Sequence, residues 1–155
     1  MRGVDLSGLQ CSVARTLDVV GERWTLLVLR DAFQGKHRFE EFSRSLPIAR
    51  NVLTQRLRTL VTHGILARHQ YEDHPPRYEY RLTPKGRDLY PVIVALVQWG
   101  DRYLAGSVGP PLEILHRDCG GHVGAQAVCA DCGSEVTARD TRAVYSFENG
   151  ESASR

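Results

Sequence analysis

The sequence lacks the features that define several classes of protein. It contains no apolar run of about 18 residues that could cross a membrane, and its first residues lack the basic-then-apolar layout of a signal peptide. It also lacks a glycine-rich phosphate loop, a nucleophile elbow and the paired carboxylates of acid–base enzymes. We therefore expect a cytoplasmic protein with no membrane partner, no catalytic residues and no enzymatic activity.

Cysteine is scarce, and its placement is uneven. Of the four cysteines, Cys119, Cys129 and Cys132 fall within fourteen residues, whereas Cys11 stands alone. In a reducing compartment such clustering favours a metal site over disulfide bonds. A chain of 155 residues, 42% apolar and 25% charged, therefore has room for one medium domain and a small metal-binding appendage.

The net charge of only +2 hides a division along the chain. Residues 1–106 hold 16 Lys and Arg against 11 Asp and Glu, whereas residues 107–155 hold 4 against 7. The basic excess is concentrated in residues 36–87, where 11 basic residues stand against 5 acidic ones. A basic block flanked by neutral or acidic segments indicates contact with nucleic acid, although basic surfaces also serve acidic proteins and membranes.

Apolar residues at helical spacing predict helices through the first two thirds of the chain. We expect three short helices at residues 12–20, 24–33 and 39–46, with Ser12 as the N-cap of the first. The pattern of the second also permits a buried strand. A fourth helix, over residues 49–63, follows a tight connection and completes a helix-turn-helix arrangement.

The fourth helix has two contrasting faces. Its apolar face consists of Leu53, Leu57, Leu60 and Val61. The opposite face has no acidic and no long aliphatic residue, and it carries Asn51, Thr54, Gln55, Arg58 and Thr62. Amide, hydroxyl and guanidinium groups are those that pair with base edges and phosphates. Taken alone, the helix would also suit an ordinary amphipathic surface position, but its neighbours favour base recognition.

A hairpin is predicted directly after this helix. Two stretches of alternating character, residues 65–71 and 77–82, flank the turn-forming segment 72–76. We expect the tip of the hairpin, segment 72–76, not to be strand itself. In this position, over residues 65–82, the hairpin is a wing that contacts the DNA backbone or the minor groove.

A last helix is expected to begin after Thr83 and to reach about residue 105. Pro91 lies inside its pattern, so we expect a kink or a break near Leu89 and Tyr90. The helix has more apolar surface than one wing can cover. Pairing with the N-terminal helix would bury that surface in a homodimer, which also suits the two-fold recognition of DNA half-sites.

The sequence thus predicts a fold that is mainly α with a small β-hairpin: a winged helix-turn-helix domain over residues 9–106 that binds double-stranded DNA. We expect bases to be read by Asn51, Thr54, Gln55 and Arg58. We expect phosphates or the minor groove to be contacted by Lys36, Arg38, Arg50 and Arg77. Arg56 lies nearer the apolar side of its helix and could instead pair within the domain.

Six motifs in this part of the chain resemble those of one bacterial family. They are Cys11-Ser12-Val13-Ala14, Gly21-Glu22-Arg23-Trp24-Thr25, Arg38-Phe39, Leu53-Thr54-Gln55-Arg56-Leu57-Arg58-Thr59-Leu60, Pro76-Arg77-Tyr78-Glu79-Tyr80-Arg81-Leu82-Thr83-Pro84-Lys85-Gly86 and Gln98-Trp99-Gly100. Over about residues 9–105 the sequence is similar to the HxlR family of winged helix-turn-helix transcriptional regulators, which is related in architecture to the MarR group. The resemblance implies a homodimer on operator DNA, with the helix at 49–63 in the major groove. One departure is Cys11-Ser12, where many members have Cys-Pro.

The clustered cysteines lie in two similar pentapeptides, His116–Gly120 and Cys129–Gly133, which share Asp-Cys-Gly and follow a composition typical of a flexible linker. Two ligands separated by two residues and followed by glycine form a metal knuckle. Two facing knuckles give a closed four-ligand set, which we expect to consist of His116, Cys119, Cys129 and Cys132. His122 competes with His116 for the histidine position.

This ligand set favours structural zinc, Zn²⁺, in a small zinc-ribbon-like module over residues 113–140, because thiolates and imidazole at this spacing prefer tetrahedral zinc. Such tails are found on some HxlR-like proteins. We expect residues 141–155 to form a disordered tail. An alternative to the DNA-binding function is a zinc-ribbon adaptor that binds protein partners without reading DNA sequence.

Two roles are possible for Cys11. Free cysteine is often a small buried hydrophobe. In some HxlR-like regulators the cysteine at this motif senses electrophiles or oxidants, which requires an exposed thiolate favoured by nearby positive charge. Arg15 or the N-terminus of the first helix could supply that charge. A small effector bound between subunits is another form of control, although no residue pattern supports it.

Overall fold

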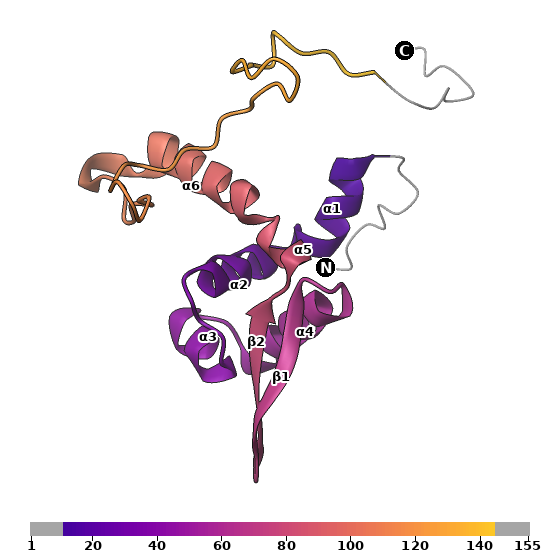
Figure 1. Cartoon of the computed structure of the whole chain (residues 1–155). Helices are drawn as coiled ribbons and strands as arrows, with labels where there is room; N and C mark the ends of the chain where they lie inside the picture. Colours follow the sequence, from indigo (N-terminus) through magenta and orange to yellow (C-terminus); the bar gives the residue numbers. More distant parts are fainter. Residues whose placement is uncertain (1–10, 145–155) are drawn as a thin grey trace.

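The chain folds into a helical domain that carries a long two-stranded hairpin, and an extended arm follows it (Figure 1). The computed structural model describes residues 11–144, so most of the expected tail at 141–155 lies outside the described residues. The helices are α1 (Ser12–Val20), α2 (Arg23–Phe33), α3 (Phe39–Ser45), α4 (Arg50–Thr62), α5 (Pro84–Arg87) and α6 (Tyr90–Leu104). The strands are β1 (Leu66–Asp73) and β2 (Pro76–Leu82), and a 3-10 turn, Gly106–Val108, precedes the arm.

Helix periodicity predicted these helices well. The apolar run of α2 is a helix and not the alternative strand. The chain breaks between α5 and α6 at Asp88 and Leu89, as Pro91 predicted, because a proline is tolerated only in the first turn of a helix. The N-cap of α1 is Cys11 and not Ser12, so the expected cap was wrong by one residue. No helix of residues 11–144 is long and apolar enough to span a membrane.

The hairpin reaches further than predicted. Glu72 pairs with Arg77 and Asp73 with Pro76, so the expected loop at 72–76 is reduced to two residues. The register shifts between Gln70 and Glu72, and this bulge allows pairing to continue beyond it. The prediction was wrong because Pro76 is the first residue of an edge strand, where its missing N–H costs no ladder hydrogen bond.

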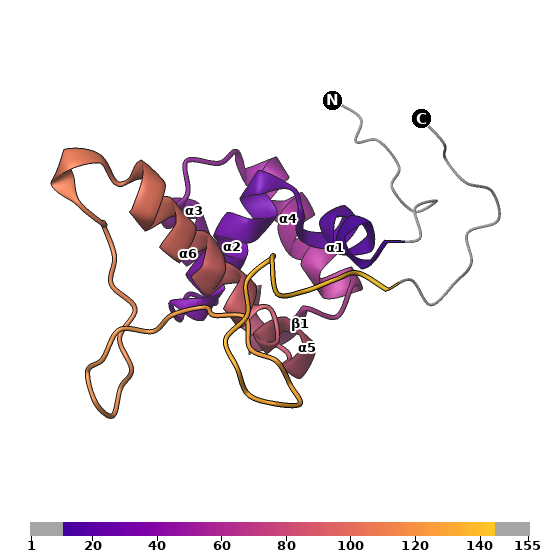
Figure 2. The same cartoon turned by 90° about the horizontal axis from the view of Figure 1, so that it is seen from above.

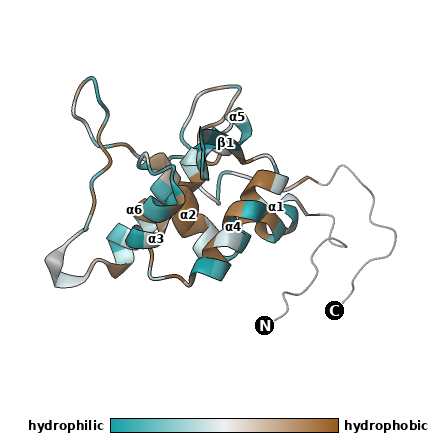
Figure 3. Cartoon of the chain, turned by 90° about the horizontal axis from the view of Figure 1, so that it is seen from below, coloured by the Kyte–Doolittle hydropathy of each residue, from teal (hydrophilic) through white to brown (hydrophobic). Residues whose placement is uncertain are grey.

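Helix α2 is the centre of the hydrophobic core. It contacts α1, α3, α4, α6 and β2. Figure 3 shows hydrophobic residues gathered where α1, α2 and α4 meet, with hydrophilic residues on the outer part of α4. The largest fully buried apolar side chains are Leu29, Phe42, Leu53, Leu57, Leu60 and Leu66. The leucines of α4 therefore decide which way the helix faces.

The C-terminal end of α4 is joined to the base of the wing. Gly64 has a φ of 67°, the left-handed conformation that ends a helix and that glycine adopts readily. The Lys85 ammonium donates to the His63 carbonyl oxygen at 2.8 Å, and the Thr83 hydroxyl donates to the Gly64 carbonyl oxygen at 2.6 Å. These bonds hold the wing at a fixed position beside α4.

Replacing Leu57 by alanine should lower the free energy of unfolding by about 2–5 kcal/mol, because the side chain is fully buried and its removal leaves a cavity. Urea titration followed by circular dichroism measures the change. The matched control is Arg58→Ala on the exposed face of the same helix, which should change the free energy of unfolding by no more than about 0.5 kcal/mol. Equal losses in both variants would contradict the assignment of the two faces.

Candidate nucleic-acid interface

The polar face of α4 is turned to solvent. Asn51, Thr54, Gln55 and Arg58 are all exposed, while the leucines between them are buried. The Thr54 hydroxyl donates to the Arg50 carbonyl oxygen at 2.8 Å, and Asn51 Oδ1 accepts from the Val52 N–H at 2.9 Å. Within residues 11–144, no hydrogen bond or ion pair holds the Arg58 guanidinium. This face therefore presents donors and acceptors to a ligand outside the protein.

The wing is fixed beside the start of α3. The Tyr80 N–H donates to the His37 carbonyl oxygen at 2.7 Å. The backbone of Arg38 forms an isolated antiparallel β-bridge with that of Glu79 in β2. The Arg38 guanidinium lies 4.7 Å from the centre of the Tyr71 ring, a cation–π distance. The hairpin, α3 and α4 are thereby joined into one surface.

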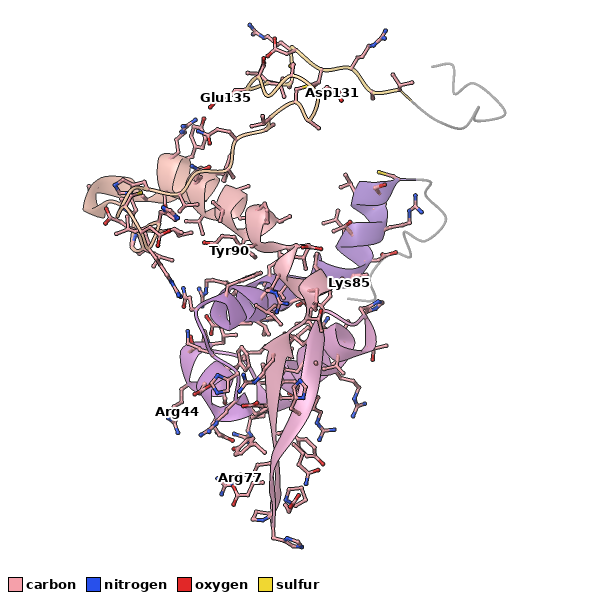
Figure 4. All side chains as sticks on the ribbon, viewed as in Figure 1. Arg44, Arg77, Lys85, Tyr90, Asp131 and Glu135 are labelled. Carbon is pink, nitrogen blue, oxygen red and sulfur yellow. The ribbon has the colours of Figure 1, made fainter. Side chains whose placement is uncertain are left out.

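A groove of about 660 Å³ lies between α3, the start of α4 and the wing. Four arginines line it, and we call it the arginine groove: Arg38, Arg44, Arg50 and Arg77. Figure 4 shows Arg44 and Arg77 on the same side of the molecule, where α3 and the wing come together. The groove gathers positive charge next to the exposed face of α4, as a phosphate-binding surface requires.

Carboxylates hold two of these arginines in place. Arg50 Nη2 lies 2.8 Å from Glu40 Oε1, and Arg77 Nε lies 3.2 Å from Glu72 Oε2. The hydrogen bond from Arg50 lowers the pKa of Glu40 below its ordinary value, so this carboxylate stays ionised at neutral pH. Exposed ion pairs contribute little to stability, and a phosphate can take the place of the carboxylate without a large cost.

One predicted phosphate contact lies elsewhere. Lys36 Nζ is 3.3 Å from Oδ1 of the fully buried Asp31, and it donates to the Gln34 side chain at 3.1 Å. Asp31 Oδ1 also accepts from Arg30 Nη2 at 2.7 Å, so the Lys36 ammonium joins an ion pair at a buried carboxylate, which needs charged partners. Arg56 pairs within the domain, since its Nε lies 3.6 Å from Glu22 Oε2.

Sequence reasoning missed Arg44. It is exposed on α3, four residues after Glu40, and it lines the arginine groove. Residues four apart lie on the same face of a helix. Arg44 lies on the first helix of the helix-turn-helix and faces the same way as Glu40 and its partner Arg50. That position was the signal that could have identified it as a residue of the groove.

Cys11 is exposed in the protomer, so the reading as a small buried hydrophobe is wrong. It is the N-cap of α1, and its thiol pKa is lowered chiefly by hydrogen bonds from the backbone N–H groups of Ala14 and Val13. Arg15 lowers the thiol pKa by a smaller amount. The helix N-terminus, more than Arg15, makes this thiol acidic.

The predicted zinc ligands do not come together in one chain. Among residues 11–144, no three histidine, cysteine or acidic side chains gather closely enough to hold a metal. Figures 1 and 2 both show the two pentapeptides as separate turns of the arm, the first in orange and the second in gold. In this structure the expected ligands therefore lie in two separate turns, and the zinc site stays a prediction.

A basic groove beside an exposed polar helix, with a hairpin fixed next to both, defines a DNA-binding protein of the winged helix-turn-helix class. The HxlR-like helix-turn-helix family model matches residues 19–107. The chain belongs to the HxlR-like family and is a transcriptional regulator of the helix-turn-helix type. The adaptor alternative is not favoured.

Relatives of the chain carry the same assignment. An uncharacterized HTH-type transcriptional regulator of Mycobacterium tuberculosis, Rv3095, is 51% identical over 129 residues, covering 83% of this chain and 82% of the relative. The crystal structure of PA1607, a protein assigned as a transcription factor, matches with a TM-score of 0.81 and 43% identity. That match covers 89% of this chain and 96% of PA1607. HypR, a redox regulator, matches with a TM-score of 0.56 and 40% identity over 59% of this chain and 92% of HypR.

Arg44→Ala should reduce the dependence of duplex binding on salt, lowering the slope of log affinity against log salt by about 1, because one phosphate contact is lost. Fluorescence anisotropy with a labelled duplex at several salt concentrations measures the slope. Arg142→Ala in the arm removes the same charge far from the groove and should leave the slope unchanged. An identical slope for Arg44→Ala and the unchanged protein would exclude Arg44 from the interface.

Proposed function

We propose that the protein is a homodimeric regulator that binds operator DNA, with α4 in the major groove and the wing on the backbone or in the minor groove. The observation that carries the proposal is the exposed, acid-free face of α4 next to the arginine groove. Asn51 and Gln55 offer amides suited to adenine, and Arg58 offers a guanidinium suited to guanine. Arg38, Arg44, Arg50 and Arg77 supply the phosphate contacts.

Exposed apolar side chains on two helices support the homodimer. On α1, Val13 is 66% and Leu17 49% exposed; on α6, Leu96 is 50%, Trp99 58% and Tyr103 62% exposed. Surface of this kind marks a protein interface. Figure 1 shows α1 and α6 on the opposite side of the molecule from the tip of the wing. A second copy paired across these helices would leave both wings and both α4 helices free for a two-fold DNA site.

Arg58→Ala should weaken binding to the operator by roughly 1–3 kcal/mol, or about 5- to 150-fold, because a bidentate base contact is lost. Gel shifts on the DNA upstream of the protein's own gene measure the affinity. Arg23→Ala, which removes an exposed arginine from the start of α2, is the matched control and should bind as before. Unchanged affinity for Arg58→Ala would show that α4 is not the reader, and no operator binding at any salt concentration would favour the adaptor.

Control through Cys11 is the finer part of the proposal. The thiol is exposed, sits at the N-terminus of α1 and has a lowered pKa, which together favour reaction with electrophiles or oxidants. HypR, a redox regulator to which the chain is similar, has solved structures in its reduced and oxidized forms. Because α1 belongs to the proposed dimer interface, a modified Cys11 would change how the two DNA-binding faces are spaced.

Alkylation of Cys11 should lower operator affinity at least about tenfold, a coupling of the size typical between two linked sites. The protein is treated with N-ethylmaleimide, modification is located by mass spectrometry, and binding is measured by gel shift. Cys11→Ser treated in the same way is the control and should keep its affinity. Full affinity of protein alkylated at Cys11 would refute this control mechanism.

A further inference from the structure

The first pentapeptide of the arm forms a compact turn. The His116 N–H donates to the Gly121 carbonyl oxygen at 2.8 Å, and the Gly120 N–H donates back to the His116 carbonyl oxygen at 2.8 Å. His116 Nδ1 lies 3.3 Å from Cys119 Sγ, and the Gly121 N–H donates to the same sulfur at 3.4 Å. We call residues 116–121 the first knuckle; it brings one imidazole and one thiol together.

The second pentapeptide repeats this geometry thirteen residues later. The Cys129 N–H donates to the Ser134 carbonyl oxygen at 2.9 Å, and the Gly133 N–H donates to the Cys129 carbonyl oxygen at 2.9 Å. Gly133 has a φ of 74° where Gly120 has 69°, a left-handed backbone that favours glycine. We call residues 129–134 the second knuckle; it carries two thiols, those of Cys129 and Cys132.

The repeat decides which histidine belongs to the ligand set. His116 occupies the place of Cys129, and Cys119 the place of Cys132. His122 pairs with Leu115 beside the first knuckle as Glu135 pairs with Val128 beside the second, so His122 holds a bridge position and not a ligand position. Each knuckle thus supplies two soft ligands, whereas a structural zinc site needs four.

Helix α6 holds the bases of the two knuckles of one chain at separate places. The base of the first knuckle shares a cavity with Val97 and Asp101, and the base of the second shares one with Ala95 and Trp99. Gln98 and Arg102 line both cavities, so the two bases lie on neighbouring faces of α6 with these two side chains between them. The segment that joins the knuckles is tied to the helix by Gln98, whose side-chain oxygen accepts from the Ala125 N–H at 2.7 Å. This hydrogen bond fixes the middle of the joining segment on α6.

The second knuckle lies over the surface that a partner would cover. Its base and the exposed rings of Trp99 and Tyr103 line one cavity of about 830 Å³, and these rings belong to the proposed dimer interface. In Figure 4, Asp131 and Glu135 lie on an outstretched part of the arm, beyond α6 and on the opposite side from the wing. An arm in this position can reach a second copy packed on α6.

We propose that each zinc site is completed between subunits, with His116 and Cys119 from one subunit and Cys129 and Cys132 from the other. A two-fold dimer then holds two tetrahedral zinc ions, and each binding event releases the thiol protons to solvent without any change of oxidation state. The sites link the two arms around the paired α6 helices. This inference rests on the proposed homodimer, and its test separates the two.

The test combines two complementary variants. His116→Ala with Cys119→Ser removes the first knuckle, and Cys129→Ser with Cys132→Ser removes the second. Each is purified alone with zinc, and the two are also co-expressed with different affinity tags so that the mixed dimer can be isolated. Native mass spectrometry reports the number of chains and of zinc ions in the same spectrum. Far-UV circular dichroism confirms that both variants keep the helical domain, to which the exposed knuckle side chains contribute no core residue.

The expected result is two zinc ions in the unchanged dimer, none in either variant dimer and one in the mixed dimer, which retains one complete site. A mixed dimer without zinc, beside an unchanged dimer with two, would show closure within one chain and overturn the proposal. One zinc in the dimer that lacks the first knuckle would also overturn it, in favour of a site of four cysteines. A dimer without any zinc would refute the metal site alone, whereas a monomer at every concentration would refute the dimer itself.

Discussion

The burial of one face of α4 against α2 is the constraint on which the rest of the structure depends. Leu53, Leu57 and Leu60 are fully buried, and because they recur at helical spacing they fix the rotation of α4 about its axis. Asn51 and Arg58 are exposed as a direct consequence. The hydrophobic core therefore decides which polar residues of α4 face solvent, where they are available to contact a ligand.

Electrostatic pairs then organise the surface around this helix. Asp31 is buried with Arg30 and Lys36 as partners, and its pair with Lys36 spans the connection between α2 and α3, while Glu40 and Glu72 pair with exposed arginines. The difference lies in solvation. Separating a buried ion pair leaves an unpaired charge in the protein interior, which costs much free energy. An exposed pair is screened by water, so one of its members can bind another ion at little cost. The same residue types thus serve structure in one place and recognition in another.

Local periodicity was enough to predict the helices, the hairpin and the exposed polar face of α4, since each depends on residues close together in the sequence. It could not predict the partner of Lys36, because Asp31 becomes buried only when α2 packs against its neighbours. It also could not show that the two knuckles lie apart along the arm, because ligand spacing carries no information about the distance between ligands in space. The hairpin tip was missed for a third reason: turn-forming residues such as Pro76 also fit the first position of an edge strand.

The most direct test of the central claim is a selection of bound duplexes from a pool of random sequence, read by sequencing. A homodimer that reads bases through α4 predicts an enriched inverted repeat whose half-site centres lie about 10 base pairs, or a multiple of this, apart. Repeating the selection with Arg58→Ala should relax the preference at one position of each half-site and leave the spacing unchanged. Recovery of duplexes without a common sequence, or of single half-sites, would contradict the claim.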